Sequence, residues 1–189
     1  EILTFYPWDC RPYDYNCPNA SIITNRIRTL NKISNRNKKN ILLITSVNAI
    51  LQKVPAKEEI QKNSLLIRKG QQISIENIVA SLVNNGYIRQ SSSYVPGDFS
   101  VRGGIIDIVT TLAGENIGYR IDMFSDEIES IKSYDPISQL SQDNINNIEI
   151  LPAGEIILNE ESIANFRANY RKIVTSGLNF DYKDEVFEN

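Results

Sequence analysis

The spacing of the apolar residues changes near Gly86, and this change constrains the fold more than any other feature. Before Gly86, apolar runs alternate with helical patterns; after it, apolar residues recur at every second position as far as Leu151. A period near 3.6 residues is typical of a helix with one buried face, and a period of two is typical of a half-buried strand. The sequence therefore predicts an α/β segment followed by a unit rich in antiparallel strands.

The first segment has the order strand, helix, strand, helix. "ILTFYP" is a strand candidate, and "ILLIT" is a continuous apolar run of the kind found in buried parallel strands. From Ser21 the apolar positions follow helical spacing, with Arg26 and Arg28 outside the apolar stripe. A second helix is predicted from Val47 to Lys53. Both strands are expected to be covered by helices.

The second region begins near Leu65 with the strand candidate "SLLIRKG", followed by a helix that Ser74 caps and that stops at Gly86. The predicted strands after it are Tyr87–Gln90, Phe99–Val101, Gly104–Val109, Ile117–Phe124, Glu127–Tyr134 and Ile145–Leu151. Short loops between strands favour antiparallel pairing, so this region is predicted to be an α+β unit. After Pro152, Asn159 is predicted to cap one more helix, with acidic residues in its first turn and basic residues in its last.

Composition excludes several kinds of site. The chain has no histidine, which removes Ser-His-Asp, Cys-His and histidine-based metal chemistry. Cys10 and Cys17 are the only cysteines and cannot close a tetrahedral zinc site; we expect reduced thiols. A phosphate-binding loop is absent, since no Gly-Lys dipeptide occurs. We therefore expect no catalytic residues, no bound cofactor and no metal site in this chain.

The net charge of −3 argues against a free-standing nucleic-acid binder. No apolar run approaches the roughly 20 residues that span a bilayer, and the start of the chain does not resemble a secretory signal. The chain begins without Met and ends in an acidic stretch. We therefore expect a piece of a longer cytoplasmic protein with no membrane partner.

The turn "SD" between "YRIDMF" and "EIESIK" predicts a two-residue hairpin. The predicted cross-strand pairs are Phe124–Glu127, Met123–Ile128, Asp122–Glu129 and Arg120–Ile131. This register places Arg120 and Phe124 among acidic residues on the face away from the core, and Lys132 on the opposite face. We accordingly expect alanine at Arg120 or Phe124 to leave thermal stability nearly intact.

Two interpretations of that face stay open at this point. Arginine and aromatic residues dominate many protein interfaces, so the face would suit a partner. Single exposed aromatics are nevertheless common, and Arg120 could simply neutralise Asp122 or Glu129. Arg102, which precedes a Gly-Gly pair, is equally consistent with a solvated bulge. Four carboxylates in the hairpin are spread by strand alternation and a turn, so they predict no metal site.

Several motifs, in order, resemble the amino-terminal module of the bacterial transcription-repair-coupling factor family (Mfd). They are "FYPWDCRPYD", "GYIRQSSSYVPGDFSVRGGIIDI", "YRIDMFSDEIESIKSYDPISQLS" and "IEILPAGE". The homologous region of the excinuclease protein UvrB is similar but less close, since that protein normally carries a phosphate-binding loop. Departures from the family pattern include Val109-Thr110 for Phe-Pro, Ser125 for glycine, and Leu140 for the usual arginine.

The resemblance implies a fold, a partner and a site. The fold would be a degenerate helicase-like α/β domain formed by residues 1–65 and 152–189, with an α+β domain inserted at 66–151. The inserted domain would bind the excinuclease protein UvrA through Arg102, Arg120 and Phe124. The function would be that of a non-catalytic adaptor, with ATP, magnesium, RNA polymerase and DNA bound elsewhere in the full-length protein.

Two competing hypotheses remain. One is an ATP-dependent translocase or UvrB-like domain that acts directly on DNA. The other is a DNA-binding module, for which Arg26-Arg28 and Lys38-Lys39 are the local basic clusters. The missing phosphate-binding loop and the acidic net charge speak against both.

Overall fold

The computed structural model describes residues 1–10, 17–35, 40–112, 114–156 and 160–175 of the 189-residue chain. The chain divides into two compact units, Glu1–Ile157 and Leu158–Asn189. Within the first unit, helices accompany one parallel strand pair and two sheets whose pairing is mainly antiparallel. The predicted mixed α/β class with antiparallel sheets is confirmed. The three predicted domain ranges, 1–65, 66–151 and 152–189, stay predictions.

The amino-terminal part of the first unit follows the predicted order. Strands β1 (Ile2–Phe5) and β2 (Leu42–Thr45) pair in parallel, and helix α1 (Ala20–Ser34) lies between them in the sequence. Helix α2 (Val47–Leu51) follows β2, and the sequence prediction missed a further short helix, α3 (Lys57–Lys62). That helix has one buried apolar residue, so it shows no apolar stripe to detect.

The prediction that "ILLIT" is a buried strand is wrong. Leu42, Leu43 and Ile44 of β2 are exposed to solvent. Parallel strands become buried when further strands and helices cover them on both faces. Among the described residues of this unit, β2 has β1 as its one strand neighbour.

Arg26 of α1 is also misplaced by the sequence prediction, since it is fully buried rather than outside the packed face. Its guanidinium forms an ion pair with Glu155 and donates to the Tyr6 carbonyl oxygen at 2.6 Å and to Gln52 Oε1 at 3.0 Å. The guanidinium carbon lies 4.2 Å from the centre of the Phe5 ring. A buried charge is tolerated when it is paired and hydrogen-bonded in this way.

The second region begins with β3 (Leu65–Arg68), which pairs with β10 (Asn147–Ile150) in antiparallel fashion. Helix α4 (Ile75–Asn84) starts as predicted, because the Ser74 side chain accepts a hydrogen bond from the Asn77 amide. A six-stranded sheet follows in the order β4-β5-β6-β7-β8-β9, antiparallel throughout except between β4 and β5. Its strands are β4 (Ile88–Arg89), β5 (Asp98–Arg102), β6 (Ile105–Leu112), β7 (Glu115–Phe124), β8 (Glu127–Tyr134) and β9 (Ser141–Asn144).

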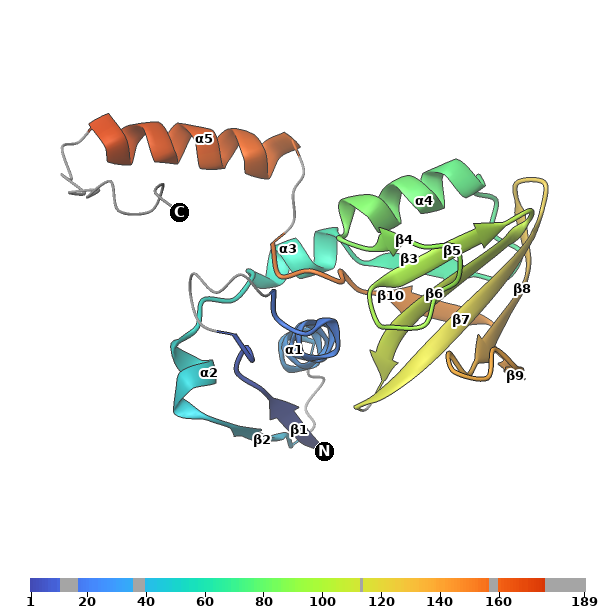
Figure 1. Cartoon of the computed structure of the whole chain (residues 1–189), viewed down its shortest axis with the longest axis horizontal. Helices are drawn as coiled ribbons and strands as arrows, with labels where there is room; N and C mark the ends of the chain where they lie inside the picture. Colours follow the sequence, from blue (N-terminus) through green and yellow to red (C-terminus); the bar gives the residue numbers. More distant parts are fainter. Residues whose placement is uncertain (11–16, 36–39, 113, 157–159, 176–189) are drawn as a thin grey trace, which may run out of the picture. The chain divides into compact units, whose positions relative to one another are not determined.

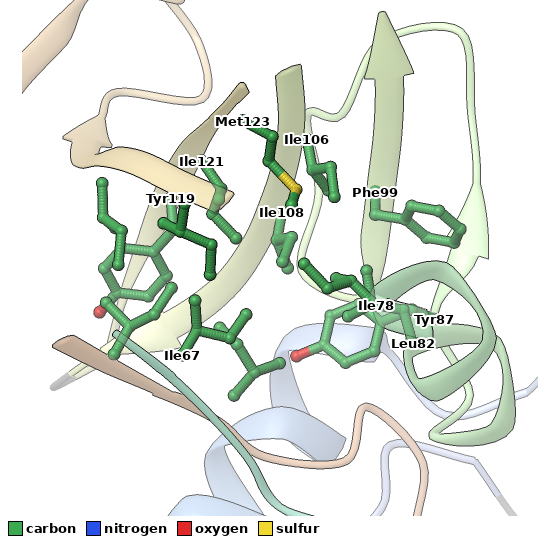
Figure 2. Packing of buried hydrophobic residues seen from close by; sticks show 14 of the residues in the cluster. Ile67, Ile78, Leu82, Tyr87, Phe99, Ile106, Ile108, Tyr119, Ile121 and Met123 are labelled. Carbon is green, nitrogen blue, oxygen red and sulfur yellow. The ribbon is translucent and has the colours of Figure 1, made fainter. Parts of the chain in front are cut away.

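Helix α4 lies over one face of this sheet (Figure 1). Its buried Ile78 and Leu82 meet side chains from the sheet, among them Phe99, Ile106 and Ile121, in one apolar cluster (Figure 2). Full burial of one such side chain stabilises the fold by roughly 1.5–3 kcal/mol. The opposite face of the six-stranded sheet, turned away from α4, is called the outer face below.

The Gly-Gly pair between β5 and β6 has a steric explanation. Gly103 adopts a φ of 60°, in the left-handed region that side chains disfavour. A Cβ atom on Gly104 would lie 2.6 Å from the carbonyl oxygen of Met123, at the end of β7. The turn therefore requires glycine at both positions, one for its conformation and one for the close approach.

The predicted hairpin register is correct at its turn and wrong further along. Phe124 pairs with Glu127 and Met123 with Ile128, but a bulge then shifts the register. Arg120 faces Lys132, and Asp122 faces Ser130. One extra residue in β8 accounts for this shift and allows Ile128 and Ile131 both to reach the core.

The prediction that Lys132 lies on the face opposite Arg120 is therefore wrong. Paired residues of neighbouring strands share a face, so Lys132 lies on the outer face. Its ammonium nitrogen is 3.5 Å from Asp122 Oδ2. A substitution at Lys132 would therefore not serve as a control for one at Arg120, because both side chains lie on the same face.

The second unit contains helix α5 (Glu160–Thr175), as predicted, with Glu160 and Glu161 in its first turn and Lys172 in its last. The predicted cap, Asn159, lies outside the described residues. The rings of Phe166 and Tyr170 stack with centres 5.9 Å apart. Across both units, no described helix combines the length and apolar character needed to cross a membrane.

Candidate partner-binding surface

Three neighbouring strands bring two arginines onto one carboxylate on the outer face. Asp107 of β6 is paired in register with Arg120 of β7. Arg120 donates from Nε to Asp107 Oδ1 at 2.8 Å and from Nη2 to Oδ2 at 3.0 Å. Arg102 of β5 donates from Nη2 to the same Oδ2 at 2.7 Å. Sheet register alone therefore assembles an Arg-Asp-Arg cluster.

This cluster carries a net positive charge, because one carboxylate faces two guanidinium groups. The Asp107 side chain is only 1% exposed, so its two arginines replace water around it. The hydrogen bonds to Asp107 raise the pKa of the Arg120 guanidinium above its ordinary value, although desolvation opposes this effect. Arg120 is thus a fixed cation, held in a two-pronged ion pair.

Tyr134 of β8 packs beside this cluster. The Arg120 guanidinium carbon lies 4.8 Å from the centre of the Tyr134 ring, within the range of a cation–π contact. Burial raises the pKa of Tyr134 to about 12, and the hydroxyl group lies 2.8 Å from Ser93 Oγ. The ring crosses the backbone at Gly118, where a Cβ atom would lie only 2.2 Å from a ring carbon. A glycine on β7 therefore makes room for the ring that supports Arg120.

The three predicted site residues differ in their exposure. The Arg102 side chain is 53% exposed and Arg120 only 18%, whereas Phe124 is 77% exposed. Phe124 lies at the end of β7, four residues from Arg120, which corresponds to about 13 Å along an extended strand. The structure thus brings Arg102 and Arg120 together and places Phe124 farther along the same face.

A shallow depression adjoins Phe124. It is lined by Lys69, Gly70, Phe124, Glu127, Ile128 and Glu129. Its walls offer one aromatic ring, two carboxylates and the ammonium group of Lys69. The exposed end of β7 is thus suited to a protein partner.

The alternative in which Arg120 neutralises Asp122 or Glu129 named the wrong acids. The partner is Asp107 rather than Asp122 or Glu129, since Asp122 accepts from Ser130 Oγ at 2.6 Å. Asp107 was read as part of the apolar strand "GGIIDI" and was missed as a site residue. Its signal was a lone acid at an outward position of an otherwise apolar strand, which indicates a buried ion pair.

The described residues contain no group of three or more Cys, Asp or Glu side chains placed to hold a metal ion. Cys10 and Cys17 are not joined in a disulfide. The chemistry of the outer face is therefore that of ion pairs, amide and hydroxyl hydrogen bonds, and exposed apolar side chains.

Comparison with known proteins shows what this part of the chain is similar to. Residues 65–155 match the family model described as the UvrB interaction domain. This part of the chain is similar to the UvrB interaction domain. Arg102, Arg120 and Phe124 all lie within it, as do α4 and the six-stranded sheet.

The curated relatives extend the similarity to most of the chain. Transcription-repair-coupling factors from Rickettsia bellii and Rickettsia prowazekii are 38% and 41% identical over 171 and 170 residues, 90% of this chain and 15% of each relative. The Escherichia coli protein of the same name is 29% identical over 170 residues, 90% of this chain and 14% of the relative. The resemblance expected from the sequence is confirmed. The chain spans about 15% of the length of the curated relatives it matches.

Proposed function

We propose that this chain is a non-catalytic adaptor of transcription-coupled nucleotide excision repair. Its UvrB interaction domain would bind the excinuclease protein UvrA and so recruit it to a stalled RNA polymerase. The observation that carries the proposal is the outer face, where the Arg102–Asp107–Arg120 cluster and the exposed Phe124 share one rigid sheet. The match of residues 65–155 supports the choice of partner.

The geometry suggests a role for each exposed residue. Arg102 keeps half of its side chain in solvent, so its remaining donors are available to a carboxylate of the partner. Phe124 offers a large apolar ring that loses contact with water on binding, and such rings are common anchors of interfaces. Together they fit a partner that presents an acidic group beside an apolar socket.

The remaining parts of the proposal concern the whole protein. We infer a cytoplasmic location and a degenerate helicase-like α/β domain around β1, β2 and α1. ATP, magnesium, RNA polymerase and DNA would be bound by other parts of the full-length protein. In this chain, binding rather than chemistry would be the function, with no cofactor.

The alternative, a domain that acts directly on DNA, has weaker support. Arg26 is buried against Glu155, and Arg28 donates through Nη1 to the Thr111 carbonyl oxygen. Neither side chain is therefore presented freely to a phosphate backbone, and Lys38-Lys39 lies outside the described residues. The predicted basic cluster at Arg26-Arg28 is thus not a surface cluster.

Calorimetric titration of this chain with purified UvrA tests the proposal. We expect saturable binding that Phe124→Ala weakens roughly thirtyfold, because loss of one anchor typically costs about 2 kcal/mol. Val83→Ser is a matched control, since Val83 is an exposed apolar residue of α4, on the other side of the sheet. Absence of binding by the parent chain would refute the proposed function, and saturable micromolar ATP binding would favour the alternative.

A further inference from the structure

The connection between β8 and β9, residues 135–140, is a tightly hydrogen-bonded turn and is called the β8–β9 turn. Asp135 Oδ1 accepts the amide N–H groups of Ile137 at 2.7 Å and Ser138 at 3.1 Å. The Gln139 amide donates to the Asp135 carbonyl oxygen at 2.8 Å, and the Asp135 amide donates to the Leu140 carbonyl oxygen at 3.1 Å. These hydrogen bonds within one short segment give the turn a defined shape.

The turn is also attached to the outer face. Gln139 Nε2 donates to the Ser93 carbonyl oxygen at 3.1 Å. Arg120 Nη1 approaches the Gln139 carbonyl oxygen at 3.5 Å and Ser141 Oγ at 3.2 Å. The Arg120 guanidinium therefore connects the Asp107 carboxylate to the β8–β9 turn.

Despite this rigidity, the turn presents two large apolar side chains to solvent. Ile137 is 89% exposed and Leu140 is 69% exposed. No charged side chain occurs between Pro136 and Gln142, so nothing in this segment would attract an ionic partner group. Apolar side chains on a preformed turn lose little conformational freedom on binding, which favours affinity.

Arg120 itself has little left to offer a partner directly. Its guanidinium already faces four acceptor atoms, namely the two Asp107 carboxylate oxygens, the Gln139 carbonyl oxygen and Ser141 Oγ. A guanidinium has about five N–H donors in total. Its contacts thus hold the turn in place more than they reach outward.

We propose that the β8–β9 turn contacts UvrA through Ile137 and Leu140, and that Arg120 is the positioning residue that holds this turn. The inference rests on the proposed function and deepens it. Because segment 136–142 is uncharged, the partner surface at this turn is an uncharged apolar patch. The exposed Leu140 side chain makes this contact apolar.

The test is the calorimetric titration with UvrA, using Ile137→Ser, Leu140→Ser and the variant that combines them. We expect the combined variant to bind at least about tenfold more weakly, with an unchanged melting temperature because both side chains are exposed. Val83→Ser should bind like the parent chain. If a serine variant proves unstable, Ile137→Ala and Leu140→Ala measure the same loss of apolar contact.

A comparison of binding by two pairs of variants tests the positioning role of Arg120. Arg120→Ala should weaken binding strongly in the parent chain and only slightly in the combined Ile137→Ser/Leu140→Ser variant, because both changes disable one contact. If Arg120→Ala lowers the affinity for UvrA by the same factor in the parent chain and in the combined variant, the positioning role of Arg120 is overturned.

The outcomes separate this inference from the proposed function. If the parent binds and Phe124→Ala weakens binding, while the Ile137 and Leu140 variants bind like the parent, the role of the turn is overturned and the proposed function stands. If the parent chain does not bind UvrA, both the proposed function and this inference fail.

Discussion

Arg120→Ala should destabilise the fold, contrary to the expectation from strand alternation. The substitution removes both hydrogen bonds from Arg120 to Asp107, a carboxylate that is almost completely buried. Breaking a buried ion pair by removing one partner costs about 3–5 kcal/mol. Arg102 still donates to Asp107 at 2.7 Å, so we expect a smaller loss of about 2–3 kcal/mol in the free energy of unfolding.

Arg102→Ala is the matched control for this prediction. It removes the more exposed arginine and leaves Asp107 with its two-pronged contact to Arg120, so the expected loss is about 0–1 kcal/mol. For a chain of this size, about 1 kcal/mol corresponds to about 2–4 °C in melting temperature. Arg120→Ala should therefore lower the melting temperature by about 4–12 °C and Arg102→Ala by at most about 4 °C.

Urea unfolding followed by circular dichroism measures both variants. The midpoint should shift while the dependence on urea concentration stays constant, because the change is in stability alone. If the urea midpoint of Arg120→Ala equals that of the parent chain, or is no lower than that of Arg102→Ala, then Arg120 does not stabilise the buried Asp107 carboxylate and this prediction is wrong. Binding must consequently be measured below the melting temperature of each variant.

Three further predictions follow from other contacts. Gly118→Ala should lower stability by about 1–3 kcal/mol in the same urea assay, because the new methyl group collides with the buried Tyr134 ring; unchanged stability would mean that the ring moves freely. Arg26→Ala should lower the free energy of unfolding by about 3–5 kcal/mol, because it leaves the buried Glu155 carboxylate without its counter-charge. Restored stability in the double variant Arg26→Ala/Glu155→Ala would support that reason. Burial raises the pKa of Tyr134 from an ordinary value of 10.0 to about 12 and also raises the pKa of Tyr87. Stability should therefore be greatest below about pH 10, where these tyrosines are protonated in both the folded and the unfolded state, and should fall as pH rises from about 10 to 12, because the unfolded chain ionises first. A titration of phenolate absorbance should show late ionisation that Tyr134→Phe reduces, and ordinary ionisation of all nine tyrosines would contradict it.

The sequence predicted part of the candidate site. Alternation placed Arg120 and Phe124 on one face, as the structure has them, but left a partner site and a solvated face both open. The family resemblance selected Arg102, Arg120 and Phe124 as the binding residues, and that role remains a prediction. Asp107, which organises the arginines, was missed because its importance comes from two other strands.

Local features of the sequence determined most of the elements. The side chain of Ser74 begins α4, the "SD" turn joins β7 to β8, and the change to a period of two predicted the strands that pack under α4. These outcomes depend on interactions between residues close in sequence, or on a single apolar face that must leave water. By contrast, β9 was missed because its residues, Ser141–Asn144, are all polar and exposed.

Tertiary structure alone decided the register beyond the turn, the burial of Arg26 and the partner of Arg120. One extra residue in β8 moved Lys132 to the outer face, because each single-residue shift in pairing changes which side chains are neighbours. Arg26 is buried because Glu155, far along the chain, supplies its counter-charge. The free energy of such contacts arises between segments distant in sequence, so no local pattern in either segment records it.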